Sequence, residues 1–240
     1  MRKNVIILTH GWTGSSVFTA LIAKAGYWYG KDTFQKIDYN TYENLELIEL
    51  NKRMLEELGF GGDHEHEFDP QEVIRLEQQS ANIDLSPYRE FVARCNQNSP
   101  WIWKDPRLTW TIRVWAKMLE LEDVAFIILT RDDEQAWISS NLRRHIQSRR
   151  FTHAYNHGIT DSLKQFLGQV NKNFVELEFE DLLLRPEDTI ADINRHLGTV
   201  LTKEDLTNTY NGQLYRKSNG LKDKLKATAI YLKNYNQRYR

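Results

Sequence analysis

A run of small and hydroxyl-bearing residues follows the first apolar stretch of the chain. Residues 9–16 read Thr-His-Gly-Trp-Thr-Gly-Ser-Ser and come directly after the apolar residues 5–8. Small residues let backbone N–H groups converge, and the positive end of a following helix dipole attracts an anion such as a phosphate. A turn that is only capped by Thr13 or Ser15 needs one hydroxyl, whereas this loop contains four. The spacing therefore predicts a phosphate-binding loop.

The same loop lacks two features of the P-loop of nucleoside-triphosphate kinases and ATPases. If Gly14 is the second glycine of the G-x-x-x-x-G-K-[ST] pattern, Thr9 replaces the first glycine and Ser15 replaces the lysine. A kinase would then be without loop closure and without the cation that clamps the γ-phosphate. The loop sequence therefore argues against a P-loop kinase.

Two more segments place cations after apolar runs. Arg131 follows residues 124–129, and Ser139 lies about two helical turns further on, so both side chains can bind one phosphate. The turn Lys104-Asp105-Pro106-Arg107 follows another apolar run. The alternatives are an exposed ion pair of Arg131 with the aspartates that follow it, and a salt-bridged turn. Neither spacing identifies a function by itself.

Four short apolar runs predict the strands that position these loops. They lie at residues 5–8, 101–103, 124–129 and 174–179, and helical periodicity separates them. Parallel neighbours need a crossover connection, so this alternation predicts an α/β fold around a central parallel sheet. Ligands of such sheets bind at the carboxyl ends of the strands. All three loops follow strands, so we expect them to meet at one edge of the sheet.

Residues 31–99 show a different pattern. They are mostly polar, and Leu45, Ile48, Leu55 and Leu58 recur at a spacing that places them on one side of a helix. No segment in this range has the pattern of a strand. We therefore expect a helical insertion beside the sheet, within a single domain that spans residues 1–240.

The composition excludes several classes of protein. The 240 residues carry 32 Lys and Arg against 33 Asp and Glu, and Cys95 is the only cysteine, so no intramolecular disulfide can form. The longest apolar run falls far short of the roughly 20 residues of a membrane helix, so we expect no membrane span. The apolar run at residues 5–8 is too short for the core of a signal peptide, so the expected location is the cytoplasm. An acidic middle segment and a basic C-terminal segment match no nucleic-acid-binding signature, and no nucleic acid partner is predicted.

Taken together, the motifs resemble PAPS-dependent sulfotransferases of the bacterial type. These enzymes transfer a sulfuryl group from 3′-phosphoadenosine 5′-phosphosulfate (PAPS). Residues 12–16 resemble the family loop that holds the 5′-phosphosulfate, and Arg131 and Ser139 match the pair that holds the 3′-phosphate. Bacterial members commonly carry the Lys-Asp-Pro-Arg turn seen at residues 104–107, and a last signature resembles Phe179-Glu180-Asp181-Leu182-Leu183 with Pro186 and Leu197-Gly198.

The resemblance covers residues 5–198 and implies both a fold and a cofactor. The fold is a three-layer α/β/α arrangement of the P-loop NTPase type, and the cofactor is PAPS, with PAP as its product. A basic segment near the C-terminus would fold across the nucleotide. The cofactor-binding residues implied are Gly11, Trp12, Thr13, Gly14, Ser15, Ser16, Arg131, Ser139 and Arg216.

The resemblance also implies roles in the reaction, in which an acceptor oxygen or nitrogen attacks sulfur in line. Lys104 is the candidate for stabilising charge on the leaving phosphate. Asp105 is the first candidate for the general base, and Glu43 is the second. The acceptor is expected to be a hydroxyl or amine of a small molecule or a glycan. No metal is expected, since His64 and His66 are more typical of a solvated polar loop.

A basic run follows the proposed 3′-phosphate pair. It is expected to continue the helix that carries Ser139, and a polyanionic glycan is one acceptor that it would attract; a solvated helix face is the alternative. The run consists of Arg143, Arg144, Arg149 and Arg150.

Trp12 departs from the family pattern. The family has a lysine or arginine at this position, which usually contacts the oxygen that bridges phosphate and sulfate, and an indole brings no positive charge there. Either Lys104 or, as the second candidate, Arg107 supplies the missing cation, or the protein is a non-catalytic relative that binds PAP or PAPS. The sequence leaves both alternatives open.

Overall fold

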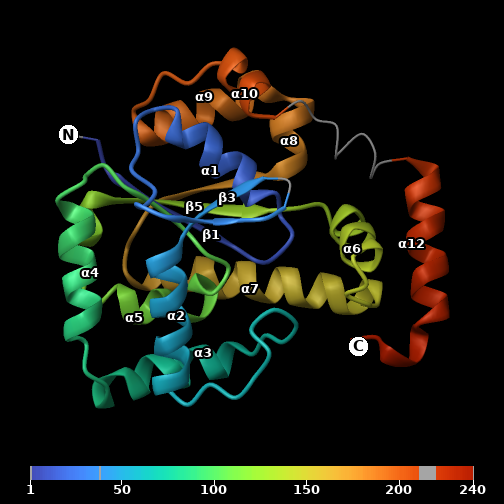
Figure 1. Ribbon diagram of the computed structural model, residues 1–240, viewed down its shortest axis with the longest axis horizontal. Coiled ribbons are helices and arrows are strands. Elements are labelled where there is room, and N and C mark those ends of the chain that lie inside the picture. The colour runs from blue at the N-terminus through green and yellow to red at the C-terminus, as the bar shows by residue number, and fades with distance from the viewer. Residues whose placement is uncertain (1, 38, 211–219, 240) are drawn as a thin grey trace.

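A four-stranded parallel β-sheet forms the centre of the protein (Figure 1). The computed structural model describes residues 2–37, 39–210 and 220–239. The sheet order is β4-β1-β5-β6, and these strands span Ile102–Lys104, Asn4–Thr9, Val124–Thr130 and Phe174–Glu178. All four strands predicted from the apolar runs are confirmed.

The register of β1 brings the predicted loops together. β1 is buried along its whole length, because it pairs with β4 and β5 at its two edges and its side chains enter hydrophobic cores on both faces of the sheet. Val5 pairs with both Ile102 and Ala125, and Thr9 pairs with Leu129. A strand that is covered on both faces is apolar at nearly every position, which is why the sequence shows it as an unbroken run. The loops after β1, β4 and β5 therefore leave the same edge of the sheet.

Helices cover both faces of the sheet and make three layers (Figure 1). One face carries α1 (Ser15–Ala23), α8 (Phe179–Leu184), α9 (Pro186–Leu197) and α10 (Lys203–Thr209). The other carries α2 (Leu45–Glu57), α3 (Pro70–Gln79), α4 (Ser86–Asn96), α5 (Leu108–Trp115) and α7 (Arg149–Gln169). Val5 and Ile7 enter the first core, and Ile6 and Leu8 enter the second. The α/β/α fold is as expected.

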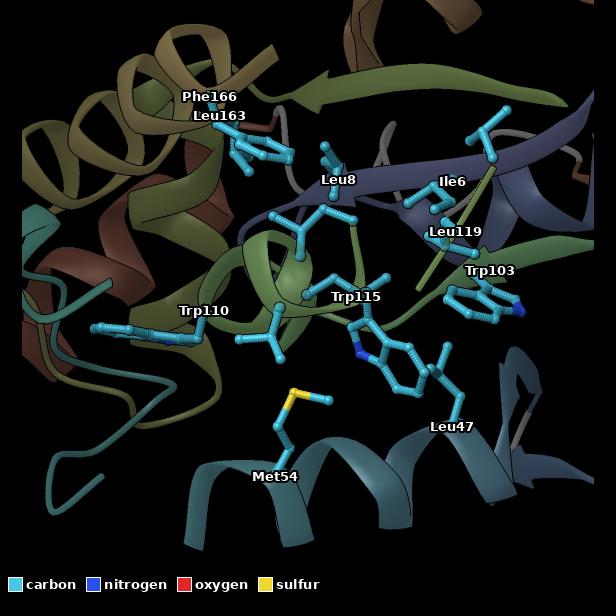
Figure 2. Close-up of a cluster of buried hydrophobic side chains, with 14 of the residues drawn as sticks. Ile6, Leu8, Leu47, Met54, Trp103, Trp110, Trp115, Leu119, Leu163 and Phe166 are labelled. Carbon is cyan, nitrogen blue, oxygen red and sulfur yellow. The ribbon is translucent and has the colours of Figure 1, made fainter. Parts of the chain in front are cut away.

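Tryptophans fill much of the core beneath the sheet (Figure 2). Trp103 of β4 and Trp115 of α5 have ring centroids 5.0 Å apart, and Leu47 and Met54 of α2 pack into the same cluster. Asn51 is fully buried on α2, and its Oδ1 accepts a hydrogen bond from Nε1 of Trp115 at 2.8 Å. This bond fixes α2 against α5.

Residues 31–99 contain a hairpin that the apolar pattern did not predict. Strands β2 (Thr33–Gln35) and β3 (Asn40–Asn44) form a separate antiparallel pair, so the expectation of an insertion without a strand is wrong. Both strands are short and largely polar, so they carry no clear period-two signal. Asn44 ends β3 and caps α2, because its Oδ1 accepts from the N–H of Glu46 at 2.9 Å. The rest of the segment is mainly helical, although Leu45 is exposed rather than on the buried face.

The helix that carries Ser139 ends earlier than predicted. α6 spans Asp133–Leu142, and Arg144 adopts a φ of +65°, so the chain turns before α7 begins at Arg149. The expectation that the whole basic run continues this helix is therefore wrong. Arg149 and its neighbour belong to α7, which packs beneath the sheet, whereas Arg143 stays beside Ser139.

The remaining described elements are short turns and one helix near the C-terminus. The 3₁₀ turns span Ser80–Asn82, Leu121–Asp123 and Tyr235–Gln237. α12 (Leu221–Lys233) packs along α6, where Tyr231 meets Trp137 with ring centroids 5.8 Å apart. None of the helices within the described residues is long and apolar enough to cross a membrane.

Candidate functional site

The loop between β1 and α1 is a tight turn that requires glycine at one position. Trp12 and Gly14 both adopt left-handed backbone conformations, with φ of +68° and +77°. A Cβ added at Gly14 would lie 2.4 Å from the ring of Phe179. The loop therefore packs so close to α8 that only glycine fits at this position. The hydroxyls of Thr9 and Thr13 lie 2.5 Å apart and close the turn from inside.

The first turn of α1 is not capped by a side chain. Its N-cap is Gly14, and the Thr13 hydroxyl is directed instead at Thr9 and at the carbonyl of His10, 3.4 Å away. The alternative of a helix that Thr13 or Ser15 merely caps is therefore not supported. Backbone N–H groups at an uncapped helix start are suited to an anion. No heavy atom lies within 4 Å of a Cβ built at Gly11, so space remains beside the loop.

Arg131 links this loop to two other elements. Its Nη1 donates to the carbonyl of Trp12 at 2.6 Å, and its Nε lies 3.3 Å from Oε1 of Glu180 in α8. Both charged side chains are buried, so the alternative of an exposed pair with Asp132 or Asp133 is not supported. Burial lowers the pKa of the Arg131 guanidinium, and the Glu180 carboxylate opposes that shift. Arg131 is thus a buried cation at the loop. Glu180 was visible in the Phe179-to-Leu183 motif, but its partner was not.

Ser139 lies next to Arg143, which also contacts Trp12. Ser139 is buried on α6, and Nη1 of Arg143 donates to its hydroxyl and, at 3.2 Å, to its carbonyl. The Arg143 guanidinium also lies over the Trp12 indole, 5.2 Å from the ring centroid. Lys36, from the turn between β2 and β3, has its Nζ 5.6 Å from the same ring. Two cations, Arg143 and Lys36, therefore lie against the Trp12 ring, at the position where the family loop has one cationic side chain. The sequence pattern did not indicate the contact of Lys36.

Lys104 lies at the end of β4, above the start of α1. Its Nζ is 2.5 Å from Oε1 of Glu43 and 3.5 Å from the Ser16 hydroxyl. The Lys104 side chain is 1% exposed and that of Glu43 is 14% exposed, so this ion pair is shielded from water. Burial lowers the pKa of Lys104, while the Glu43 carboxylate raises it. The structure thus brings a cation, a carboxylate and a loop hydroxyl together.

Asp105 has a different environment from the one expected of a base. It is fully buried, and its Oδ2 accepts from Nδ2 of Asn51 at 2.9 Å. Its Oδ1 accepts from the backbone N–H and Nη1 of Arg107, at 3.1 and 3.0 Å. These bonds fix the turn after β4 to α2. Both oxygens of Asp105 are thus occupied by protein donors, whereas Glu43 is the carboxylate that contacts Lys104.

The histidines near the loop have separate surroundings. His10 is buried, and burial lowers its pKa to about 4, while a bond between Nδ1 and the Gly11 carbonyl opposes the shift. Nε2 of His66 lies 2.7 Å from Nδ1 of His145, and His145 stands against Trp12 with ring centroids 4.7 Å apart. His64 has its Nε2 buried without a hydrogen-bond partner among the described residues. Arg216, the predicted lid residue, lies outside the described residues.

Comparison with known proteins identifies the class that this fold and site define. A family model described as the sulfotransferase family matches residues 6–203. The chain therefore belongs to the sulfotransferase family, and it is a sulfotransferase enzyme by class. No match was found among curated proteins.

One solved structure with a TM-score above 0.5 shares the fold, and two others match with lower scores. The sulfotransferase domain from the curacin biosynthetic pathway superposes with a TM-score of 0.54 at 15% identity, covering 88% of this chain and 78% of that one. The sulfotransferase domain of the olefin synthase from Synechococcus PCC 7002 has a TM-score of 0.48 at 19% identity, covering 86% and 76%. A sulfotransferase from Mycobacterium avium has a TM-score of 0.48 at 15% identity, covering 97% and 76%.

Proposed function

We propose that the protein transfers a sulfuryl group from PAPS to a hydroxyl or amine of a small molecule or glycan. The observation that carries this proposal is the buried Lys104, which lies between the Glu43 carboxylate and the Ser16 hydroxyl at the start of α1. A buried cation beside an uncapped helix start is suited to stabilising a dianionic leaving group. Bound PAPS would supply the sulfuryl group and its phosphate leaving group.

The residues around the loop fit such a nucleotide. The Val17 N–H donates to the Gly14 carbonyl at 2.9 Å, and no side chain caps the start of α1, so the backbone N–H groups of Ser15 and Ser16 would be the donors to the 5′-phosphosulfate. Arg131 and Ser139 would hold the 3′-phosphate, since a buried guanidinium and a hydroxyl are its natural donors. Arg143, already in contact with the Ser139 hydroxyl, would join them.

The missing loop cation is replaced in this proposal by charges from other elements. Lys104 would stabilise the charge that develops on the departing phosphate, and Lys36 and Arg143, which flank Trp12, would add positive potential at the loop. This arrangement favours an active enzyme over a non-catalytic PAP-binding relative, since Trp12 does not leave the site without cations.

Glu43 is the carboxylate best situated to act as the general base. Its Oε1 accepts from Nζ of Lys104, which also lies 3.5 Å from the Ser16 hydroxyl, so an acceptor bound at the start of α1 would have a carboxylate close by to take its proton. Asp105 accepts hydrogen bonds from Asn51 and Arg107 on both oxygens, and it would act by holding the turn in place. Asp105 is thus a positioning residue in this proposal, in place of the base first expected.

The test is thermal stabilisation of the protein by PAP, with ATP and Mg²⁺ in parallel. A ligand at about 100 times its Kd adds about 2.7 kcal/mol, which in a chain of this size raises Tm by roughly 5–10 °C. We expect this rise in the wild type and its loss in Arg131→Ala. Arg113→Ala is the matched control, because Arg113 is an equally buried arginine paired with Glu77 away from the loop.

Each outcome separates the candidate functions. PAP stabilisation followed by transfer from labelled PAPS in an acceptor screen supports the sulfotransferase. PAP stabilisation without transfer to any acceptor supports a binding relative. Greater stabilisation by ATP and Mg²⁺ than by PAP would favour a kinase and overturn the proposal. A PAP effect in Arg131→Ala as large as in the wild type would show that the nucleotide does not bind at Arg131.

A further inference from the structure

Three potential metal ligands converge outside the proposed nucleotide site. Oδ2 of Asp133, in the first turn of α6, lies 2.6 Å from Nδ1 of His153 and 3.2 Å from Nε2 of His157. Within the described residues these atoms form a group whose members all lie within 4.8 Å of one another. Neither the phosphate loop nor the Lys104 site uses any of them.

The helix α7 places the two histidines on one face. Residues four apart on a helix are neighbours, and the imidazoles of His153 and His157 have centroids 4.1 Å apart. Both side chains are more than half exposed, so an ion can reach them from solvent. Imidazole nitrogens with a carboxylate oxygen suit ions of the Zn²⁺ class, whereas Mg²⁺ and Ca²⁺ prefer oxygen ligands alone.

Asn156 orients the carboxylate from the other side. Its Nδ2 donates to Oδ1 of Asp133 at 3.0 Å, which leaves Oδ2 pointing at the two imidazoles. A hydrogen bond to the non-ligating oxygen is the usual support of a carboxylate ligand. A tetrahedral ion with bonds of about 2.0–2.2 Å holds its ligand atoms roughly 3.3 Å apart, so small side-chain movements of His153 and His157 are sufficient.

A second set of one aspartate and two histidines, Asp63, His66 and His145, has a geometry that does not suit a metal ion. Oδ2 of Asp63 lies 2.7 Å from Nδ1 of His66, and the other nitrogen of His66 faces Nδ1 of His145 at 2.7 Å. These groups form a line in which each atom is taken by its neighbour. They do not face a common point, so this set provides no comparable site.

We propose that Asp133, His153 and His157 bind one divalent transition-metal ion of the Zn²⁺ class. Three protein ligands leave a tetrahedral ion one further position, which water would fill. The ion would fasten α7 to the first turn of α6, two residues after Arg131. The role is structural, and the proposal stands independently of sulfuryl transfer.

The experiment is calorimetric titration of Zn²⁺ into the purified full-length protein in a buffer that does not chelate metals. We expect one site with a micromolar Kd, weakened at least about tenfold in His153→Ala and in His157→Ala. Both residues are exposed, so neither change should prevent folding. Asn156→Ala should weaken binding by a smaller factor. His64→Gln is the control, because His64 lies outside the group, and its titration should match the wild type.

A spectroscopic measurement gives a second readout. Co²⁺ in place of Zn²⁺ should give the intense visible absorption of a tetrahedral site in the wild type and not in Asp133→Asn. The proposal is overturned if Zn²⁺ binds no more tightly than millimolar, or if His153→Ala and His157→Ala bind it as the wild type does. Stabilisation by PAP should be unchanged in both histidine variants, so failure here is distinct from failure of the proposed sulfotransferase function.

Discussion

Replacing Lys104 by methionine tests the centre of the proposed site. Methionine keeps most of the apolar stem and removes the charge, which leaves the Glu43 carboxylate without its partner. Loss of one preorganised charge at a developing anion lowers kcat by about 10²–10³. PAP binding through Arg131 should persist, because that guanidinium contacts the Trp12 carbonyl and Glu180 and has no bond to Lys104.

The same change should reduce stability by a predictable amount. Removing one partner of a buried ion pair costs about 3–5 kcal/mol, and the 14% exposure of the Glu43 side chain places the expected loss near the lower value. In a chain of this length about 3 kcal/mol corresponds to a fall in Tm of roughly 6–12 °C. The double variant Lys104→Met with Glu43→Gln removes the stranded charge, so it should recover most of the stability and none of the turnover.

The assays are urea unfolding, PAP binding, and transfer from labelled PAPS to an acceptor found in the screen. Lys203→Met is the control for losing an ion-paired lysine, because Lys203 and Glu187 are both largely exposed and their pair should contribute under about 1 kcal/mol. The reasoning is refuted if Lys104→Met retains its kcat within about threefold, against the loss expected for such a group. If the double variant is no more stable than Lys104→Met alone, the stability loss does not come from the unpaired Glu43 carboxylate.

Three further changes test the loop and its surroundings. Gly14→Ala should cost about 1–3 kcal/mol in unfolding free energy because its Cβ would meet the Phe179 ring, whereas Gly11→Ala should cost little; equal effects in denaturant unfolding would contradict this. The folded His10 binds protons less readily than the unfolded chain, so stability should fall by about 2 kcal/mol from pH 7 to pH 4.5, and His10→Phe should lose that part of the fall in urea titrations. Ser139→Ala should weaken PAP binding about fivefold to tenfold in calorimetry by removing one donor, and wild-type affinity would exclude Ser139 as a phosphate ligand.

The strands could be predicted from the sequence because burial on both faces makes them apolar throughout. Residues 124–129 of β5 are all buried, and the run is visible without any knowledge of its partners. The hairpin of β2 and β3 could not be predicted, because its strands are short and largely polar and therefore show no apolar run. The break after α6 was also not predicted, because Arg144 has a φ of +65°, a left-handed conformation that arginine seldom adopts.

At the candidate site, the spacing of motifs in the sequence predicted candidate residues but not the side chains that these residues contact. Arg131 contacts the Trp12 carbonyl, and Ser139 contacts Arg143, which lies over the Trp12 ring; the role of Arg131 and Ser139 as phosphate ligands stays a prediction. The choice between Asp105 and Glu43 depended on Asn51 and Lys104, which contact them across 54 and 61 positions of the sequence. Contacts over such separations leave no local signal. The His153 and His157 pair does have one, namely a helical spacing of four, but Asp133 completes it only in the folded chain.

The strand order has a consequence for the chain while it is being synthesised. β1 lies in the middle of the sheet, yet both of its partners, β4 and β5, follow it only after the long segment that contains α2, α3 and α4. At about 5–20 residues per second, a ribosome needs roughly 5–20 s to pass from Val5 to its partner Ile102. During that time the apolar strand has no neighbour on either side. The central strand is thus made before both of its partners, and an apolar strand that waits unpaired is the kind of surface that chaperones bind.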